Sequence, residues 1–234
     1  MNKLSVRLEA VANYVDDNSK VIDIGCDHGF LSIFLAKKYD NIKIIASDIN
    51  ENALNNAISN INKLNLQNKI ETRLGSGLDV VTADEIDTII ISGMGSNTIV
   101  GMLKYARNKL TYVKDIIVQS NTDLYFLRKN IVSLGYYIAD ETLVKDKNII
   151  YTVIKFSKGK KKYNYKELYL GPILISKNDD LFREKNRKEI NTLRMIVNGI
   201  GNGHYFYKKR LKRNIRILEK MVLCQIVWVN KNSL

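Results

Sequence analysis

Between residues 20 and 156 the chain alternates short runs rich in β-branched residues with amphipathic stretches of helical period. The runs expected to form parallel strands are residues 20–24, 42–47, 69–74, 87–92 and 115–119. Parallel strands need crossover connections, and helices that alternate with strands cover both faces of one sheet. The sequence therefore predicts a doubly wound α/β domain.

Two further runs, residues 136–144 and 149–156, are separated only by a short polar turn at residues 145–148. That connection is too short for a crossover, so the two runs should form an antiparallel hairpin at one edge of the sheet. The complete sheet would then have seven strands. Residues 51–64 should form a helix capped by Asn50, and a short amphipathic helix over residues 4–12 should precede the first strand.

Charge divides the chain into two parts. The net charge is +13; residues 1–157 hold 18 basic and 18 acidic residues, whereas residues 158–234 hold 19 basic and 6 acidic ones. A positive field confined to one part of a protein is the usual footprint of nucleic-acid binding. A solvated pair of basic helices is the alternative that composition alone leaves open.

The basic part should be helical. Residues 178–197 and 204–226 read as two long helices joined by a turn that contains Gly199, Gly201 and Gly203. In the second helix an apolar seam of coiled-coil type comprises Leu211, Ile215, Leu218 and Val222. Its basic side chains are Lys208, Lys209, Arg210, Lys212, Arg213 and Arg216. We expect an antiparallel hairpin about 30 Å long, preceded by a linker near residues 158–162.

The sequence lacks the features of membrane proteins, secreted proteins, disulfide frameworks and zinc sites. No apolar run approaches the roughly 18 residues that span a bilayer, and the first residues have no apolar signal core, so we expect a cytoplasmic protein. Cys26 and Cys224 form neither a disulfide framework nor a zinc pattern, so both should be reduced thiols. We expect no metal and a monomer.

The segment over residues 21–30 leaves a buried strand, makes a glycine-rich turn and opens a helix. Gly25 and Gly29 would let a ligand approach the main chain there. A nicotinamide-dinucleotide fingerprint would require further glycines at positions 27 and 30, which are Asp27 and Phe30. That cofactor class is therefore disfavoured.

The acidic residues of the turn fit a cationic ligand better. Asp23 and Asp27 would repel a pyrophosphate but attract the sulfonium and ammonium groups of S-adenosylmethionine. The pattern Asp-x-Gly-x-Asp-x-Gly is similar to motif I of the class I methyltransferases that use this cofactor, with Asp27 in place of the middle glycine. The alternative is that both carboxylates only cap the turn and the helix. His28 could pack in the loop or contact cofactor or base.

Later strand ends supply further candidates. Asp48 follows the second strand and could bridge the two ribose hydroxyls of an adenosine, although it could also simply cap a helix. The Gly75–Ser76–Gly77 turn could close over the adenine, or it could be a plain turn without a ligand. After the fourth and fifth strands come the turn at residues 93–95 and Asn121, whose amide matches an adenine edge. Capping by Asn121 and core packing by Met94 are the alternatives.

Taken in order along the chain, these motifs resemble the TrmK family, the bacterial tRNA (adenine-N1)-methyltransferases that modify adenine 22. The resemblance rests on five segments and the terminal hairpin. The segments are Leu4-Ser5-x-Arg7-Leu8, residues 23–28, Ile91 to Gly95, Val118 to Asn121, and Gly171-Pro172. The resemblance to this family implies a Rossmann-like sheet, S-adenosyl-L-methionine as cofactor and tRNA as partner.

The resemblance and the motifs together give the expected site. The expected cofactor-binding residues are Asp23, Gly25, Cys26, Asp27, His28, Gly29, Asp48, Ile49, Ser76, Gly77, Gly93, Met94 and Gly95. The expected RNA contacts are Arg7, Lys208, Lys209, Arg210, Arg213 and Arg216. The catalytic domain would comprise residues 1–157 and the tRNA-binding hairpin residues 158–234.

For catalysis we hypothesise that Asp27 stabilises the positive charge that adenine acquires and that Asn121 orients the base. Adenine N1 carries a lone pair, so methyl transfer to it needs orientation and charge stabilisation and no strong base. Three residues depart from the family pattern: Phe30, Ser76 in place of a common Asp, and Ser120 in place of a Pro. Without that Asp, adenine recognition is expected to be weaker. Without that Pro, the Asn121 loop is expected to be less fixed.

Other functions remain as alternatives. Exocyclic adenine-N6 enzymes commonly use a tetrad with two prolines, and the chain has only Pro172. Carbon-5 cytosine enzymes need a cysteine nucleophile beside the target, and neither cysteine is placed for it. A small-molecule methyltransferase would leave the basic part unexplained. A non-catalytic RNA-binding protein that keeps the fold as a scaffold would fit the departures at Ser76 and Ser120.

Overall fold

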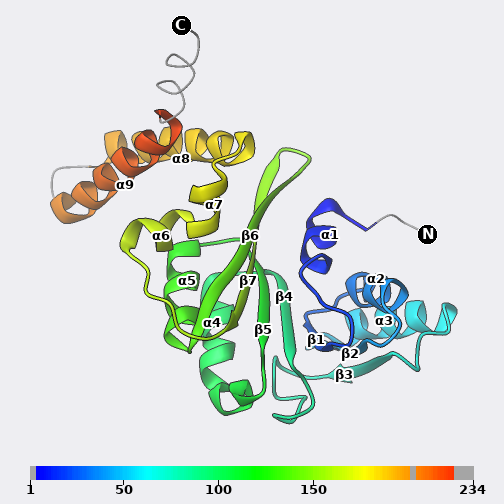
Figure 1. The fold of residues 1–234 in the computed structure, drawn as a ribbon. Coiled ribbons are helices and arrows are strands. Elements are labelled where there is room, and N and C mark those ends of the chain that lie inside the picture. Colours follow the sequence, from blue (N-terminus) through cyan, green and yellow to red (C-terminus); the bar gives the residue numbers. More distant parts are fainter. Residues whose placement is uncertain (1–3, 201–203, 224–234) are drawn as a thin grey trace, which may run out of the picture. The chain divides into compact units, whose positions relative to one another are not determined.

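The computed structural model describes residues 4–200 and 204–223. It contains two compact units, Met1–Tyr169 and Leu170–Leu234 (Figure 1). Among the described residues no helix is both long and apolar enough to cross a membrane.

The first unit is built on one seven-stranded sheet with strand order β3-β2-β1-β4-β5-β7-β6. Its strands are β1 (Lys20–Ile24), β2 (Lys43–Asp48), β3 (Ile70–Leu74), β4 (Thr88–Met94), β5 (Asp115–Ser120), β6 (Tyr136–Asp146) and β7 (Ile149–Lys158). The first five are parallel, whereas β7 runs antiparallel to both β5 and β6. The predicted fold is therefore confirmed, including the antiparallel hairpin at the edge.

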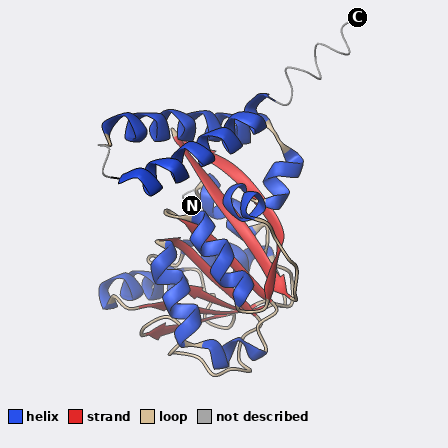
Figure 2. Ribbon diagram, turned by 90° about the vertical axis from the view of Figure 1, so that its left-hand side faces the viewer, coloured by secondary structure: helices blue, strands red, loops and turns tan. Residues whose placement is uncertain are grey.

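Helices cover both faces of this sheet (Figure 2). They are α1 (Val6–Ala12), α2 (Phe30–Lys38), α3 (Glu51–Lys63), α4 (Ser96–Tyr105), the 3₁₀ helix η1 (Arg107–Thr111), α5 (Leu124–Ser133) and α6 (Tyr165–Leu170). Crossovers are right-handed, so a reversal of strand order moves the helices to the opposite face. The reversal lies between β1 and β4. It separates α1, α2 and α3, which share one apolar cluster, from α4 and α5.

Local sequence explains the helix boundaries. The Asn50 side chain accepts hydrogen bonds from the N–H groups of Asn52 and Ala53, as expected of the α3 cap. The strands β1, β4 and β5 are central and buried on both faces, which explains their continuous Ile and Val runs.

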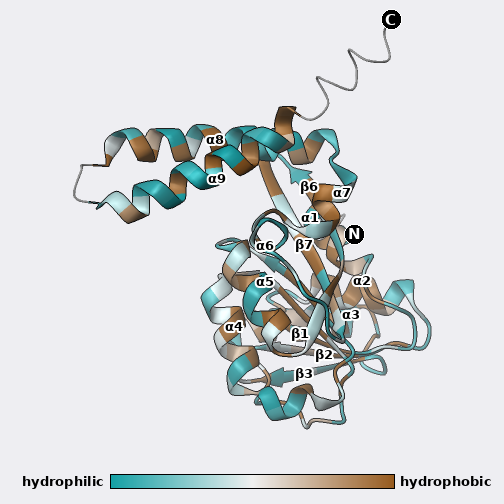
Figure 3. Cartoon of the chain, turned by 60° about the vertical axis from the view of Figure 1, so that its left-hand side comes forward, coloured by the Kyte–Doolittle hydropathy of each residue, from teal (hydrophilic) through white to brown (hydrophobic). Residues whose placement is uncertain are grey.

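The second unit contains α7 (Pro172–Lys177), α8 (Asp180–Gly199) and α9 (Tyr205–Leu223). The helices α8 and α9 pack together, and Leu211, Ile215 and Leu218 of the expected seam are buried. Both helices are mainly hydrophilic with regularly spaced hydrophobic segments (Figure 3). We call α8 and α9 the basic hairpin.

The structure differs from the sequence prediction around Pro172. The segment between the linker and the hairpin forms two short helices, α6 and α7, where we predicted none. Gly171 precedes α7 with a φ of 96°, and Pro172 occupies the first helical turn, where a missing N–H has no effect on the helix. The turn glycines Gly201 and Gly203, Cys224 and the predicted end of the last helix at residue 226 lie outside the described residues.

Candidate active site at the carboxyl ends of the parallel strands

The glycine-rich turn after β1 lies where the strand order reverses, between β1 and β4. Gly25, Asp27 and Gly29 all have positive φ, of 75°, 51° and 70°. The N–H groups of Gly25 and Cys26 donate to the carbonyl oxygen of Ser47 on β2, at 2.8 and 3.0 Å. The turn is thus held against β2 at the point where open α/β sheets bind ligands.

Gly25 also brings two loops close together. A Cβ atom at this position would lie 2.6 Å from the Cε atom of Met94, at the end of β4. The positive φ favours glycine at this position, whereas the Met94 Cε atom is the end of a flexible side chain and can move aside. The close approach places Met94 and the first turn side by side, as expected of residues that share one ligand.

Asp48 ends β2 and lies next to the same turn. One carboxylate oxygen, Oδ2, accepts the N–H of Asp27 at 3.1 Å, and the other, Oδ1, accepts the N–H of Asn50 at 2.8 Å. Each carboxylate oxygen has a second lone pair, so the pair can still accept two hydroxyl groups. The neighbouring Ile49 is 74% exposed and offers an apolar surface beside the carboxylate.

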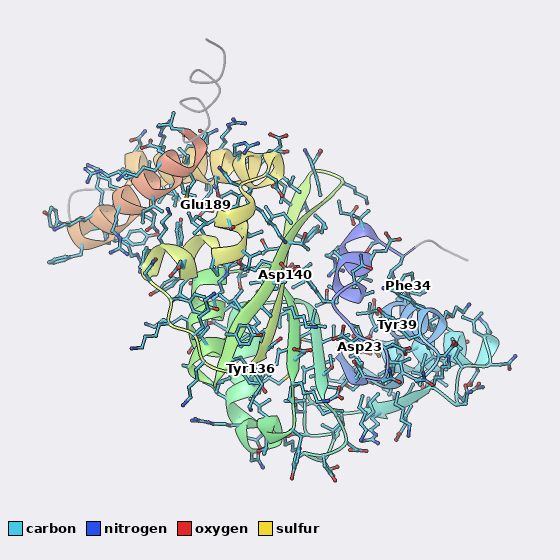
Figure 4. All side chains as sticks on the ribbon, in the orientation of Figure 1. Asp23, Phe34, Tyr39, Tyr136, Asp140 and Glu189 are labelled. Atoms are coloured by element: carbon cyan, nitrogen blue, oxygen red, sulfur yellow. The ribbon has the colours of Figure 1, made fainter. Side chains whose placement is uncertain are left out.

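Asp23 belongs to β1 and precedes the turn (Figure 4). Its side chain is buried and accepts a 2.7 Å hydrogen bond from the Ser32 hydroxyl on α2. Burial raises the pKa of Asp23 to about 6, against the opposing effect of the Ser32 hydrogen bond. Its observed contact therefore ties the turn to α2. Direct contact of Asp23 with a cofactor stays a prediction.

Cys26 is buried in the same turn and is a free thiol. Burial, reinforced by Asp23 and Asp48, raises the pKa of Cys26 to about 12. The thiol is thus protonated at neutral pH, which excludes a thiolate nucleophile at this position.

The exposed side chains of the turn are Asp27 and His28. The His28 Nε2 atom lies 3.6 Å from Asp27 Oδ1, and the imidazole stacks on Phe30, with ring centroids 5.4 Å apart. Both residues therefore face outward at the mouth of the turn. The stacking shows that His28 packs against Phe30, and its contact with cofactor or base stays a prediction.

The loop at residues 75–77 borders a cavity of its own. Ser76 is exposed, Gly77 is buried, and a cavity of about 400 Å³ is lined by Ser76, Leu78, Met102 and Tyr105 among others. A Cβ atom on Gly77 would lie 2.8 Å from the Met102 sulfur, so the loop passes closely over α4. Neither Gly25 nor Asp48 lines this cavity, so an adenine contact by Ser76 stays a prediction.

Asn121 follows β5 and faces the turn that ends β4. Its Nδ2 atom donates to the Gly93 carbonyl oxygen at 2.8 Å, and its Oδ1 accepts from Gln119 Nε2 at 2.9 Å. Ser120, which replaces the proline of the family pattern, donates to the Met94 carbonyl oxygen at 3.1 Å and lies 2.9 Å from the Ser96 hydroxyl. Hydrogen bonds thus fix the Asn121 loop without the proline.

Sequence reasoning missed the residue at the centre of this network, Gln119. It is fully buried, and its Oε1 accepts from Arg7 Nη1 at 2.6 Å and from the Gly93 N–H at 3.0 Å. Arg7 also donates to the Ser92 hydroxyl at 2.8 Å and lies over the Tyr151 ring. Its position in the sequence, as an amide at the end of an otherwise apolar strand, could have identified it as a candidate site residue. These contacts bring Arg7 to the ends of β4 and β5.

The predicted RNA contacts on α9 lie together. A groove of about 680 Å³ along the first half of the helix is lined by Tyr205 and Phe206 and by six cations. These are Lys208, Lys209, Arg210, Lys212, Arg213 and Arg216. The basic face predicted from the sequence is therefore continuous.

The residues at the reversal point fit S-adenosylmethionine. A main chain without a side chain at Gly25, a carboxylate at Asp48 and an exposed acid at Asp27 match an adenosine that carries a cationic methyl donor. The sequence matches the model of the family described as tRNA (adenine(22)-N(1))-methyltransferase over residues 21–223. The chain belongs to the TrmK family.

Known TrmK proteins are similar along most of the chain. The tRNA (adenine(22)-N(1))-methyltransferase of Bacillus subtilis is 28% identical over 204 residues, which cover 85% of this chain and 86% of that protein. The structure of M. capricolum TrmK with S-adenosyl-homocysteine superposes with a TM-score of 0.82 and 29% identity, covering 94% of this chain and 98% of that one. The family predicted from the sequence is confirmed.

A Streptococcus pneumoniae structure solved with S-adenosyl-L-methionine has a TM-score of 0.87 and 26% identity. It covers 94% of this chain and 100% of that one. The predicted cofactor is thus the one found in TrmK structures.

Proposed function

We propose that this chain transfers the methyl group of S-adenosyl-L-methionine to N1 of adenine 22 in tRNA. The observation that carries the proposal is the acidic, glycine-rich turn packed against Asp48 and Met94 at the reversal of a TrmK sheet. The cofactor supplies the methyl group as an electrophile. The chain's own residues bind it, hold the adenine in line and stabilise charge.

Asp48 is proposed to bind the ribose, because both its oxygens are already oriented by main-chain N–H groups. An acceptor that is fixed before binding loses little entropy when the ligand arrives. The Gly25 turn and Met94 would line the same ligand, and Ile49 and Ser76 would lie beside its adenine.

Asn121 is proposed to orient the target adenine. Among the described residues its bonds to Gly93 and Gln119 use one N–H and one oxygen lone pair. The amide keeps a second N–H and a second lone pair, which is the donor and acceptor pair that an adenine edge can meet. Because the amide is held from two sides, the base would be held in one orientation.

Asp27 is proposed to stabilise the positive charge that spreads over the adenine after N1 is methylated. Its carboxylate is 71% exposed and lies at the mouth of the turn, so it remains available to a ligand. An anion placed where positive charge develops lowers the barrier without accepting a proton.

The tRNA is proposed to bind through residues 158–234, which include the basic hairpin. The six cations that line the α9 groove can contact phosphates, and such contacts supply most non-specific affinity.

The test measures cofactor affinity and methyl transfer in matched variants. We expect Asp48→Asn to weaken S-adenosylmethionine binding in a calorimetric titration, and Asn121→Ala to lower kcat while it binds the cofactor normally. Asp27→Asn should lower kcat, because it removes the proposed anion. Asp40→Asn is the control, because Asp40 is a fully exposed carboxylate beyond α2. Normal turnover of both Asp27→Asn and Asn121→Ala would refute their assignment.

A further inference from the structure

A second concave surface lies beside the candidate active site. We call it the entrance groove; it has a volume of about 970 Å³ and is formed by the start of the chain, the first turn, α2 and α3. The lining residues that matter for its chemistry are Arg7, Asp27, Phe30, Phe34, Lys37 and Lys63. Of the described lining residues, only Asp27 has a role in the reaction proposed above.

The groove is continuous with the site. Asp27 lines it and also belongs to the turn after β1, and Arg7 lines it while its guanidinium donates to Ser92 and Gln119. A polymer whose target nucleotide reached Asn121 could therefore continue into the groove. A small substrate would have no part that extends so far.

The groove offers an aromatic surface at this junction. Phe30 is 47% exposed although it is a large apolar residue, and the His28 ring stacks against it with an interplanar angle of 22°. Phe34, on the next turn of α2, lines the groove further along (Figure 4). Proteins that hold single-stranded nucleic acid commonly stack unpaired bases on such rings.

The charges of the groove also favour RNA. Four of its lining residues are basic, namely Arg7, Lys37, Lys38 and Lys63, whereas Asp27 is the one acidic residue among the described residues that line it. A groove that combines apolar rings with a basic rim matches bases joined by phosphates. An apolar peptide would match the rings but not the basic rim.

We infer that the entrance groove binds the unpaired RNA next to the target adenine, with Phe30 stacking on a neighbouring base. This inference rests on the proposed function, since N1 lies on the Watson–Crick edge and is reached only when the adenine leaves its pairing partner. A base next to a displaced adenine loses a stacking neighbour. Phe30 replaces that neighbour and stabilises the open conformation of the RNA.

The first experiment compares Phe30→Leu with Phe30→Trp in steady-state kinetics on a tRNA transcript. We expect Phe30→Leu to raise KM for tRNA about ten-fold, which is within the range measured for loss of one base–aromatic stack. The dissociation constant for S-adenosylmethionine should stay unchanged, and Phe30→Trp should restore KM. Tyr112→Ala is the control, because Tyr112 is an aromatic residue that is 60% exposed outside the groove.

A second readout does not depend on turnover. The fluorescence of 2-aminopurine, placed on either side of the target adenine, should be quenched when wild-type protein binds the tRNA and should remain unquenched with Phe30→Leu. Quenching by Phe30→Leu as strong as by wild type, or an unchanged KM, would overturn the inference. Absence of methyl transfer by the wild type, with quenching intact, would instead refute the proposed function alone.

The basic rim is tested by Lys37→Gln combined with Lys63→Gln. We expect weaker tRNA binding and a shallower dependence of affinity on salt, by up to about one unit of slope for each cation that contacts a phosphate. An unchanged slope would show that the cations face no phosphate and would contradict the RNA assignment of the groove.

Discussion

Gln119 shows how one buried side chain can organise a site. Its oxygen accepts from Arg7 and Gly93, and its nitrogen donates to Asn121, so a single amide connects α1 with the ends of β4 and β5. A buried polar group is stable only when its bonds are satisfied, and here the satisfied bonds fix the residue proposed to orient the base.

Replacement of Gln119 should therefore affect stability and catalysis together. We expect Gln119→Leu to lower the free energy of unfolding by about 1–3 kcal/mol, because the Gly93 N–H and the Arg7 guanidinium lose the acceptor that the buried amide provides. Methyl transfer should fall, since Asn121 loses one of its two supports. Urea denaturation and kcat are the measurements. Wild-type stability of Gln119→Leu would argue against this role of the amide.

Asp23 should make the folded protein less stable as the pH rises from about 4 to about 6. Burial raises its folded-state pKa from 3.8 to about 6, so between these values the folded chain holds a proton that the unfolded chain has lost. The contribution of Asp23 to stability is complete below pH 4 and decreases as the pH rises to 6. Its full size is about 3 kcal/mol.

The difference in unfolding free energy between wild type and Asp23→Asn isolates this effect, because all other groups titrate alike in both proteins. We expect wild type to lose stability relative to Asp23→Asn between pH 4 and pH 6.5. A difference that is flat with pH would mean that the folded-state pKa of Asp23 is not raised.

The sequence predicted which residues form the candidate site better than it predicted the contacts between them. It identified Asp23, Asp48 and Asn121 as candidates from their places at strand ends, and the structure brings Asp48 against the first turn and Asn121 against Gly93. It did not reveal that Asp23 is buried or that Arg7 reaches Gln119 across the fold. Both facts depend on which helix packs over which strand, and a local pattern does not contain that information.

The helices and strands were predictable where the spacing of apolar residues is regular or their run is continuous. The five parallel strands lie within one or two residues of their predicted places because buried strands read as continuous apolar runs. β6 is longer than predicted and contains an irregularity between Ile138 and Asp140. Such a bulge changes the alternation of side chains, so the pattern alone could not follow it. The short helices α6 and α7 have too few turns to show a period.

One buried ion pair connects two elements of the first unit. Arg128 on α5 donates from Nε to Glu141 Oε1 on β6 at 2.7 Å, and both side chains are fully buried. The guanidinium also donates to the carbonyl oxygens of Leu168 and Tyr169, which ties the last residues of the unit to α5.

Removal of one partner should be far more harmful than removal of both. We expect Arg128→Met to lower the free energy of unfolding by about 3–5 kcal/mol, because Glu141 is left as an uncompensated buried charge. Combined with Glu141→Met, the loss should be smaller than for Arg128→Met alone. A double-mutant cycle from urea denaturation measures this, and simple additivity of the two single losses would contradict it.

The basic hairpin carries a prediction about salt. We expect neutralisation of Arg210, Arg213 and Arg216 to glutamine to weaken tRNA binding and to reduce the slope of log affinity against log salt by up to about three, while S-adenosylmethionine affinity stays the same. Filter binding at several salt concentrations gives the slope. Unchanged tRNA affinity would count against the hairpin as the docking element.

At the scale of the whole molecule, the two parts of the chain differ in net charge. Acidic side chains lie at the first turn, where we propose that a cation binds, and the excess of basic residues lies in residues 158–234, where we propose that a polyanion binds. The composition of each part and the basic face of the last helix were readable from the sequence. The structure adds that Tyr205 and Phe206 line the same groove as these cations.

The most direct measurement is to incubate the purified protein with isotopically labelled S-adenosylmethionine and an unmodified tRNA transcript, and to map the product by nuclease digestion and mass spectrometry. The account predicts one labelled 1-methyladenosine, at position 22, and no label in a transcript whose adenine 22 is replaced by guanine. Label at another nucleotide, or none in a protein that binds the cofactor, would contradict it.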